Sequence, residues 1–291
     1  MIKCFGTEYR FHPLFVLLML LSAMTGYFLE LLTLFGVVLI HELGHVAAAK
    51  SFGWRIREVK LLPFGGVAVT EEGANVPARE ELIVAIAGPL QNAIMIAFAL
   101  LCSRMGFGES GWWDYFLRAN LLIGLFNLLP IHPLDGGRVL FVALGRLFTY
   151  HRSLVLGTRI SLALSAFLAL GALVPSLSGG LNLNVLAVGL FLFATNWYGY
   201  RQLPFQFLRY LMGREAAARR FLKEGAEIRR LDVEKRNTLQ EVAKLFMRDK
   251  YHLICIRGSR GSVERIVPEQ ALLQVFFDGN KTDRAVSEVF L

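Results

Sequence analysis

The segment HELGH at residues 41–45 places two histidines and a glutamate inside an otherwise apolar stretch of the chain. Residues four apart share one face of a helix, so His41 and His45 can present ring nitrogens to one metal ion while Glu42 projects beside it. Zinc hydrolases use this spacing: the metal lowers the pKa of bound water to about 7, and the glutamate takes the water's proton. An unpaired ionisable group at membrane depth costs about 2.5–3.5 kcal/mol, a cost that a shared metal ion offsets. The motif therefore predicts a zinc site.

A catalytic zinc usually has three protein ligands, and the segment NLLPIHPLDGG at residues 127–137 offers two candidates for the third. Its prolines and glycines interrupt a membrane-depth helix, which is tolerated where the backbone is buried in protein or lines a water-filled cavity. Asp135 supplies a carboxylate, whereas His132 supplies an imidazole, the commonest metal ligand. Ligand chemistry favours Asp135 and leaves His132 as the alternative. A purely structural interpretation is that Asp135 caps the next helix.

Composition sets these motifs in a membrane. The chain has 291 residues, 55% of them hydrophobic and 19% charged, and its mean hydropathy is +0.48, which is far more apolar than a soluble domain. Apolar segments that approach the ~20 residues of a membrane span number about six and lie near residues 12–28, 29–50, 81–103, 115–130, 158–176 and 182–199. We therefore expect a polytopic α-helical membrane protein with about six transmembrane helices.

The distribution of Lys and Arg orients the chain, because positive charge is retained on the cytosolic side. Basic residues follow the second and fourth expected spans and continue through the tail, whereas the loop VPSLSGGLNLN carries no charge. This alternation places both termini in the cytosol. The net charge of +8 is thus explained by topology, and no nucleic-acid partner is expected.

Two further motifs lie between the metal-binding segments. Pro63, Phe64, Gly65 and Gly66 belong to a turn followed by the β-prone residues VAV, which can form an exposed edge for an extended substrate. A short hairpin on the membrane surface is the equally simple interpretation of this turn. The segment AGPLQN at residues 87–92 is assigned to close helix packing, with polar support of the active site as its alternative.

The composition changes after residue 200. We divide the chain into a transmembrane domain at 1–200, a basic amphipathic linker at 201–228 lying on the anionic leaflet, and a small cytosolic α/β domain at 229–291. Thr238 and Glu241 predict a capping box for a helix that continues to Asp249. The expected βαββα order resembles a CBS module. One such module is too small for a complete core, so it should pair with a second copy in a homo-oligomer.

HELGH followed by NLLPIHPLDGG resembles the site-2 protease family of intramembrane zinc metalloproteases, whose second motif has the form NxxPxxPLDGG. The resemblance implies that His41, His45 and Asp135 bind zinc, which decides against His132. It also implies that Glu42 is catalytic and that Asn127 engages the substrate backbone. A catalytically silent membrane receptor and a metal transporter are the competing functions, and the intact motif argues against the first.

Over its whole length the chain is similar to the sporulation branch of that family, through the loop WRIREVKLLPFGGVAVTEEG, the segment AGPLQN and the early FHPLF. The resemblance implies cleavage of a membrane-tethered precursor of the sigma factor sigma-K under the control of inhibitory membrane partners. It further implies a place in the membrane around the forespore, with the tail facing the mother cell and ATP as a possible regulatory ligand. Another membrane substrate, such as an anti-sigma factor, is the alternative.

Overall fold

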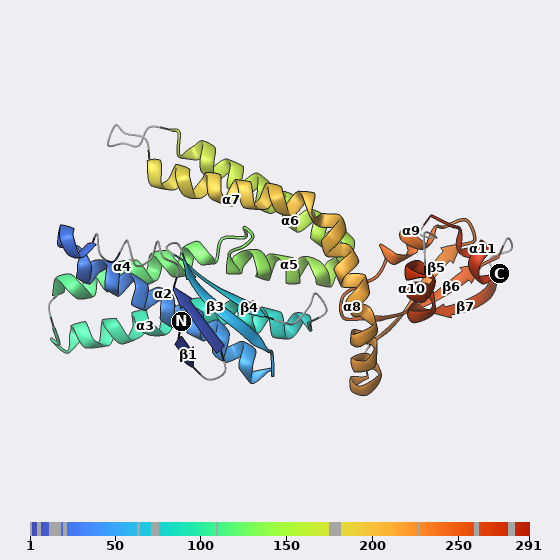
Figure 1. Ribbon diagram of the computed structural model, residues 1–291, viewed down its shortest axis with the longest axis horizontal. Helices are drawn as coiled ribbons and strands as arrows, with labels where there is room; N and C mark the ends of the chain where they lie inside the picture. The colour runs from blue at the N-terminus through green and yellow to red at the C-terminus, as the bar shows by residue number, and fades with distance from the viewer. Residues whose placement is uncertain are drawn as a thin grey trace. The chain divides into compact units, whose positions relative to one another are not determined.

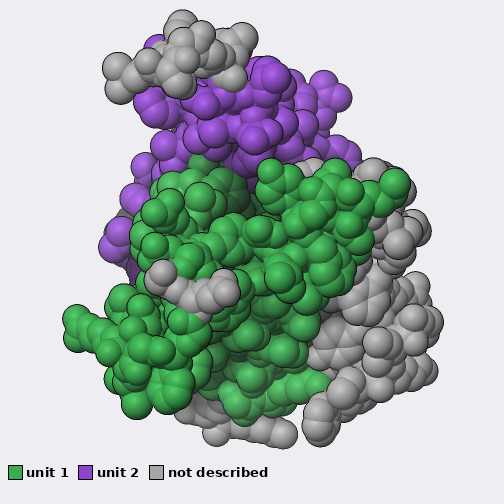
Figure 2. Space-filling view, turned by 90° about the vertical axis from the view of Figure 1, so that its left-hand side faces the viewer, with its two compact units in different colours: residues 1–72, 79–139 green, residues 73–78, 140–291 purple. Residues whose placement is uncertain are grey.

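The computed structural model describes residues 2–4, 7–11, 19, 22–62, 65–70, 76–108, 110–174, 182–225, 227–258, 262–278 and 283–291. The chain divides into two compact units, which are coloured separately in Figure 2. The first comprises residues 1–72 and 79–139, and the second comprises residues 73–78 and 140–291.

Long apolar helices make up most of the first unit (Figure 1). They are α2 (Phe28–Ser51), α3 (Ala78–Arg104), α4 (Ser110–Asn127) and the first turn of α5 (Asp135–Leu147). Gly53 ends α2: its φ of +78° suits glycine, and its N–H donates to Lys50 O at 2.9 Å. Pro89 lies inside α3 and removes one helical N–H donor there.

Three described helices are long and apolar enough to cross a membrane, namely α2, α3 and α6 (Tyr150–Gly171). They make the chain an integral membrane protein, but the expected count of six spans is not confirmed. Residues 12–18, 20 and 21 of the first expected span lie outside the described residues. The apolar part of α4 is short because Asp114 and Arg118 lie in its first half, and α7 (Leu183–Arg201) ends in polar and aromatic residues.

A four-stranded sheet accompanies the helices of the first unit. Its strands, in sheet order, are β1 (Ile2–Cys4), β2 (Thr7–Phe11), β3 (Ile56–Leu62) and β4 (Gly65–Thr70). β2 pairs with β3 in parallel, and β3 pairs with β4 as an antiparallel hairpin. Within the described strands β4 is therefore an edge strand, which agrees with an edge at VAV and equally with the alternative of a short hairpin. The two N-terminal strands were not expected.

The second unit contains α6, α7 and α8 (Leu203–Glu224), together with the C-terminal elements. These elements are β5 (Ile228–Glu234), α9 (Leu239–Ala243), β6 (Tyr251–Arg257), β7 (Val263–Pro268), α10 (Glu269–Phe277) and α11 (Val286–Phe290). β6 is the central strand, parallel to β5 and antiparallel to β7. The apolar side chains Phe207, Tyr210 and Leu211 of α8 are buried in one core with residues of this sheet. The identification of the segment as a CBS module stays a prediction, as do the domain boundaries.

The capping box at α9 forms as predicted, since Thr238 accepts from Glu241 N–H and Glu241 accepts from Thr238 N–H. The predicted continuation of this helix to Asp249 is wrong, because α9 ends at Ala243. The chain that follows is bound instead by Arg214 of α8, which donates to the carbonyl oxygens of Met247, Arg248 and Lys250 at 2.6–3.3 Å. A guanidinium with several donors thus satisfies three backbone carbonyl groups that follow the end of α9.

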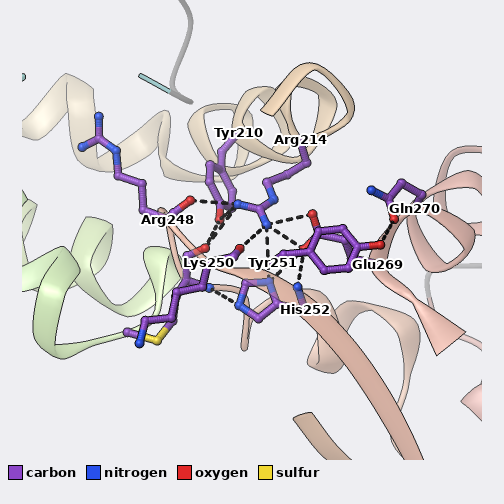
Figure 3. A network of polar contacts seen from close by, with 9 residues as sticks. Tyr210, Arg214, Arg248, Lys250, Tyr251, His252, Glu269 and Gln270 are labelled. Carbon is purple, nitrogen blue, oxygen red and sulfur yellow. Dashed lines mark hydrogen bonds and ion pairs between the residues drawn. The ribbon is translucent and has the colours of Figure 1, made fainter. Parts of the chain in front are cut away.

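Arg214 also lies at the centre of a buried ionic network, drawn in Figure 3. Its guanidinium contacts the carboxylate of Glu269, which also accepts from His252 Nδ1 at 2.8 Å. Arg214, Glu269 and His252 each have 0% exposed surface. The network thus connects α8, β6 and α10 through buried side chains.

Two side chains after α9 contact residues 76 and 78, which also belong to the second unit. Arg248 donates from Nε and Nη2 to Val76 O, at 3.0 and 2.7 Å. The carboxylate of Asp249 accepts from the N–H of Ala78, the first residue of α3, at 3.1 Å. The first N–H groups of a helix lack partners within the helix, so Asp249 satisfies one of them.

Candidate metal centre

The two histidines of HELGH lie one helical turn apart on α2, and both are buried. Asp135, also buried, is the first residue of α5 and is preceded by a turn in which Leu134 N–H donates to Ile131 O at 2.9 Å. Gly136 and Gly137 let this turn pack closely, because an added Cβ would collide with the backbone at Leu128 and Ile131 respectively. The sequence thus folds around Asp135 in a way that brings it to α2.

The ligand atoms of His41, His45 and Asp135 converge. His41 Nε2 lies 3.1 Å from Asp135 Oδ2, His45 Nε2 lies 3.2 Å from the same oxygen, and the two Nε2 atoms are 3.2 Å apart. Donors on a tetrahedral zinc, with bonds of about 2.0–2.1 Å, are separated by about 3.3 Å. The three atoms therefore have the spacing of one face of a zinc tetrahedron.

The protons on the histidines support the same interpretation. His45 Nδ1 lies 2.7 Å from Val84 O, a carbonyl that can only accept, so Nδ1 carries the proton and Nε2 presents a lone pair. His41 Nδ1 lies 2.5 Å from Asn92 Oδ1. Two ring nitrogens and a carboxylate oxygen then face one another as acceptors, an arrangement that repels unless a cation is shared between them. The residues present fit a zinc ion.

Glycine on α3 makes room for the two rings. A Cβ on Gly88 would lie 2.7 Å from His41 Nε2 and would also collide with His45 Nε2. On the facing helix α2, a Cβ on Gly44 would lie 2.7 Å from Ala87 O. Both positions therefore need glycine for α2 and α3 to approach this closely.

The remaining predicted site residues lie in different places. Glu42 follows His41 on α2 and is partly buried. Asn127 ends α4, and its amide Nδ2 donates to Ile123 O at 3.1 Å; its role in substrate binding stays a prediction. His132 is not one of the three converging ligands. The geometry thus agrees with Asp135 as the third ligand.

The substrate turn is only partly described. Pro63 and Phe64 lie outside the described residues. Gly65 and Gly66 open β4 and pair with Leu62 and Leu61 of β3. Their role in substrate binding stays a prediction.

Three residues of this centre were not assigned to it from the sequence: Val84, Gly88 and Asn92, all on α3. The segment AGPLQN, which contains two of them, was assigned to helix packing. A signal was present, since a polar side chain at membrane depth marks function by default. The sequence alone does not show how α2 and α3 pack against each other, and this packing brings Asn92 to His41.

The sequence profile of peptidase family M50 matches residues 29–110 and 104–170. The chain is also 32% identical to Stage IV sporulation protein FB of Bacillus subtilis, over 96% of this chain and 95% of that protein. The chain belongs to peptidase family M50.

Two matches to archaeal proteins narrow the class of this M50 peptidase. It is 32% identical to Zinc metalloprotease MJ0392 of Methanocaldococcus jannaschii over 69% of this chain and 58% of that protein. The solved structure of the site-2 protease from Methanocaldococcus jannaschii matches with a TM-score of 0.55 and 30% identity, covering 69% of this chain and 94% of that one. The M50 peptidase is therefore an intramembrane zinc metalloprotease of the site-2 type, which confirms the expected class of enzyme.

Proposed function

We propose that this protease removes the pro-segment of a membrane-tethered sigma-factor precursor, of the pro-sigma-K kind, on the cytosolic side of the membrane. The observation that carries the proposal is the extent of the similarity to the sporulation protein, which covers 96% of the chain and therefore includes the C-terminal elements. The matches to the archaeal proteins cover 69% of the chain. An anti-sigma factor or another membrane protein is the alternative substrate.

In this proposal His41, His45 and Asp135 hold the zinc ion. When bound, zinc would act as a Lewis acid that polarises the scissile carbonyl and lowers the pKa of bound water to about 7. Glu42, one residue from His41 on the same helix, takes the proton of the attacking water and passes it to the leaving amine. A carboxylate is suited to both steps because it can accept a proton and then return it.

Two elements present the substrate. The edge strand β4 has backbone groups available for an added strand, so an extended segment next to residues 63–66 can pair with it. Asn127 Oδ1 is available to accept from a substrate backbone N–H, since the amide nitrogen donates to Ile123 O. An extended backbone is what a protease must bind, because a helical peptide bond is shielded by its own hydrogen bonds.

Other parts of the proposal concern the cellular setting. Both termini face the cytosol, and in a sporulating cell the protein lies in the membrane around the forespore with its tail toward the mother cell. Inhibitory membrane proteins control it, and the CBS-like segment mediates homo-oligomerisation. ATP as a ligand of that segment stays a prediction.

Co-expression of the protease with a membrane-associated pro-sigma-K tests the proposal, with Glu42→Gln as the matched inactive variant. The shortened product is identified by N-terminal sequencing. We expect one cut near the start of the precursor with wild-type protein and about 10²–10⁴-fold slower cleavage with Glu42→Gln. Equal cleavage by both proteins would refute the role of Glu42. Absence of cleavage by both, with zinc bound, would refute the substrate and direct attention to other membrane proteins.

A further inference from the structure

A hydrogen-bonded chain of two asparagines leads away from the metal centre. Asn92 on α3 has 1% exposed surface, and its Oδ1 lies 2.5 Å from His41 Nδ1. An amide side chain can rotate by half a turn and exchange its acceptor oxygen for its donor nitrogen. Only the orientation with oxygen toward His41 keeps the proton on Nδ1 and leaves Nε2 free to bind a metal.

Asn120 on α4 sets the orientation of Asn92. The amide nitrogen of Asn92 donates to Asn120 Oδ1 at 3.1 Å, and the amide nitrogen of Asn120 donates to Phe116 O at 2.9 Å. Phe116 O is a backbone carbonyl and can only accept, so it fixes Asn120, which in turn fixes Asn92. Asn120 has 0% exposed surface, so bulk water does not compete for either partner.

The packing of α4 supports this arrangement. Gly124 lies one turn after Asn120, and a Cβ there would be 3.3 Å from Asn92 Cβ. The glycine thus lets α4 approach close enough for the two amides to meet.

We propose that Asn92 and Asn120 are positioning residues of the metal centre, which together hold His41 in the one tautomer that binds zinc. The inference rests on the proposed zinc site. Asn92 acts on His41 directly, whereas Asn120 acts through Asn92 and touches no ligand. The second histidine needs no such device, because its partner, Val84 O, is a backbone carbonyl that cannot exchange acceptor for donor. His41 is therefore the ligand whose protonation depends on side chains.

The test is zinc affinity, measured by chelator competition on the purified full chain in detergent. Replacement of Asn120 by Leu frees the amide of Asn92 to rotate, turn its N–H toward His41 Nδ1 and favour a proton on Nε2. Loss of an outer partner of a metal ligand typically lowers affinity about 10–100-fold, and we expect a loss in that range. Asn120→Asp should restore the affinity, because a buried protonated carboxyl can donate to Phe116 O and accept from Asn92.

A matched control is Asn196 on α7, which is also 1% exposed and donates to Leu192 O of its own helix at 2.8 Å. Asn196→Leu removes a buried amide from an apolar helix without touching the chain to His41. We expect its zinc affinity to equal that of wild type. A comparable loss in this variant would show that the measurement reports general damage and would overturn the inference.

A double variant separates positioning from packing. Aspartate at position 92 offers two acceptor oxygens, so no rotation can present a donor to His41. Adding Asn120→Leu to Asn92→Asp should therefore cause no further loss of zinc affinity. An equal loss in both backgrounds would overturn the inference, as would an unchanged affinity in Asn120→Leu alone. A wild-type protein that binds no zinc would refute the proposed function instead.

Discussion

The guanidinium of Arg214 donates to both carboxylate oxygens of Glu269, at 2.8 and 2.6 Å, and neither side chain has exposed surface. Replacement of one member of a buried ion pair leaves an uncompensated charge, which costs about 3–5 kcal/mol. We expect Arg214→Met to destabilise the C-terminal segment by that amount. Pulse proteolysis of the full chain across a urea series measures the change.

The control for this variant lies on the same helix. Arg219 pairs with Glu215 at 3.0 Å, and both side chains are more than two thirds exposed. Exposed pairs of this kind contribute little to stability, so Arg219→Met should leave the urea midpoint unchanged. Equal effects of the two substitutions would contradict the structural role of Arg214.

Acidification should weaken the same region through His252. Its Nδ1 donates to Glu269, and its Nε2 accepts from Met247 N–H at 3.1 Å, so the folded protein holds a neutral ring. Burial lowers the pKa of His252 from 6.5; the charges of Arg214 and Arg229 act in the same direction, and Glu269 opposes them. Below pH 6.5 the unfolded chain therefore binds a proton that the folded chain excludes, and stability falls as the pH drops toward the folded pKa.

The measurement is the urea midpoint of the C-terminal segment at several pH values between about 5 and 7.5, around the ordinary pKa of histidine. His252→Asn keeps a donor for Glu269 and cannot titrate. The difference between wild type and variant isolates this residue from the other histidines. The pH slope should be smaller in His252→Asn, and identical slopes would contradict the assignment.

Much of the metal centre was predictable from the sequence because its ligands obey local rules. The spacing of His41 and His45 follows from helical periodicity, and ligand chemistry favoured Asp135 in a turn rich in proline and glycine. Polar support of the active site was only the alternative for the segment with Asn92, and Asn120 was not predicted at all, because their roles depend on the rotation and separation of α2, α3 and α4. Those quantities arise from packing between segments distant in the sequence.

In the fold, too, features set by local sequence were predicted and features set by distant contacts were not. The capping box at Thr238 and Glu241 is a local pattern and forms as predicted. The end of the helix that it starts was predicted wrongly, since α9 ends at Ala243 and the carbonyl groups of Arg248 and Lys250 are bound by Arg214 of another helix, a contact distant in the sequence. The parallel pairing of β2 with β3 joins segments far apart in the chain, and no local pattern encodes such a pairing.

Gly88→Ala should empty the metal centre without unfolding the chain. The added Cβ collides with both Nε2 atoms, so the rings must move apart. We expect zinc content by elemental analysis to fall to a small fraction of wild type, and cleavage to be lost with it. Gly36→Ala is the control, because Gly36 lies on α2 and a Cβ there meets nothing within 4 Å. Full zinc content in Gly88→Ala would show that the histidine rings can bind zinc without the space that the missing Cβ leaves.

Asp135→Asn and Glu42→Gln should separate metal binding from proton transfer. Asp135 supplies a carboxylate oxygen to the converging triangle, and its amide variant keeps an oxygen but loses the negative charge, so it should lose both zinc and activity. Glu42→Gln should retain zinc and lose only cleavage, by a factor of about 10²–10⁴, the usual contribution of a general base. Unchanged zinc stoichiometry in Asp135→Asn would return His132 to consideration as the third ligand.

The contacts of Arg248 with Val76 and of Asp249 with Ala78 span 172 and 171 positions of the chain. At about 5–20 residues per second, a ribosome makes Arg248 roughly 10–30 s after Val76. During that interval α3 has no acceptor from Asp249 for its first N–H, although the helix already carries Val84, Gly88 and Asn92. A nascent protease thus gains the acceptor for the first N–H of α3 well after α3 itself has been made, and a chain released before residue 249 never gains it.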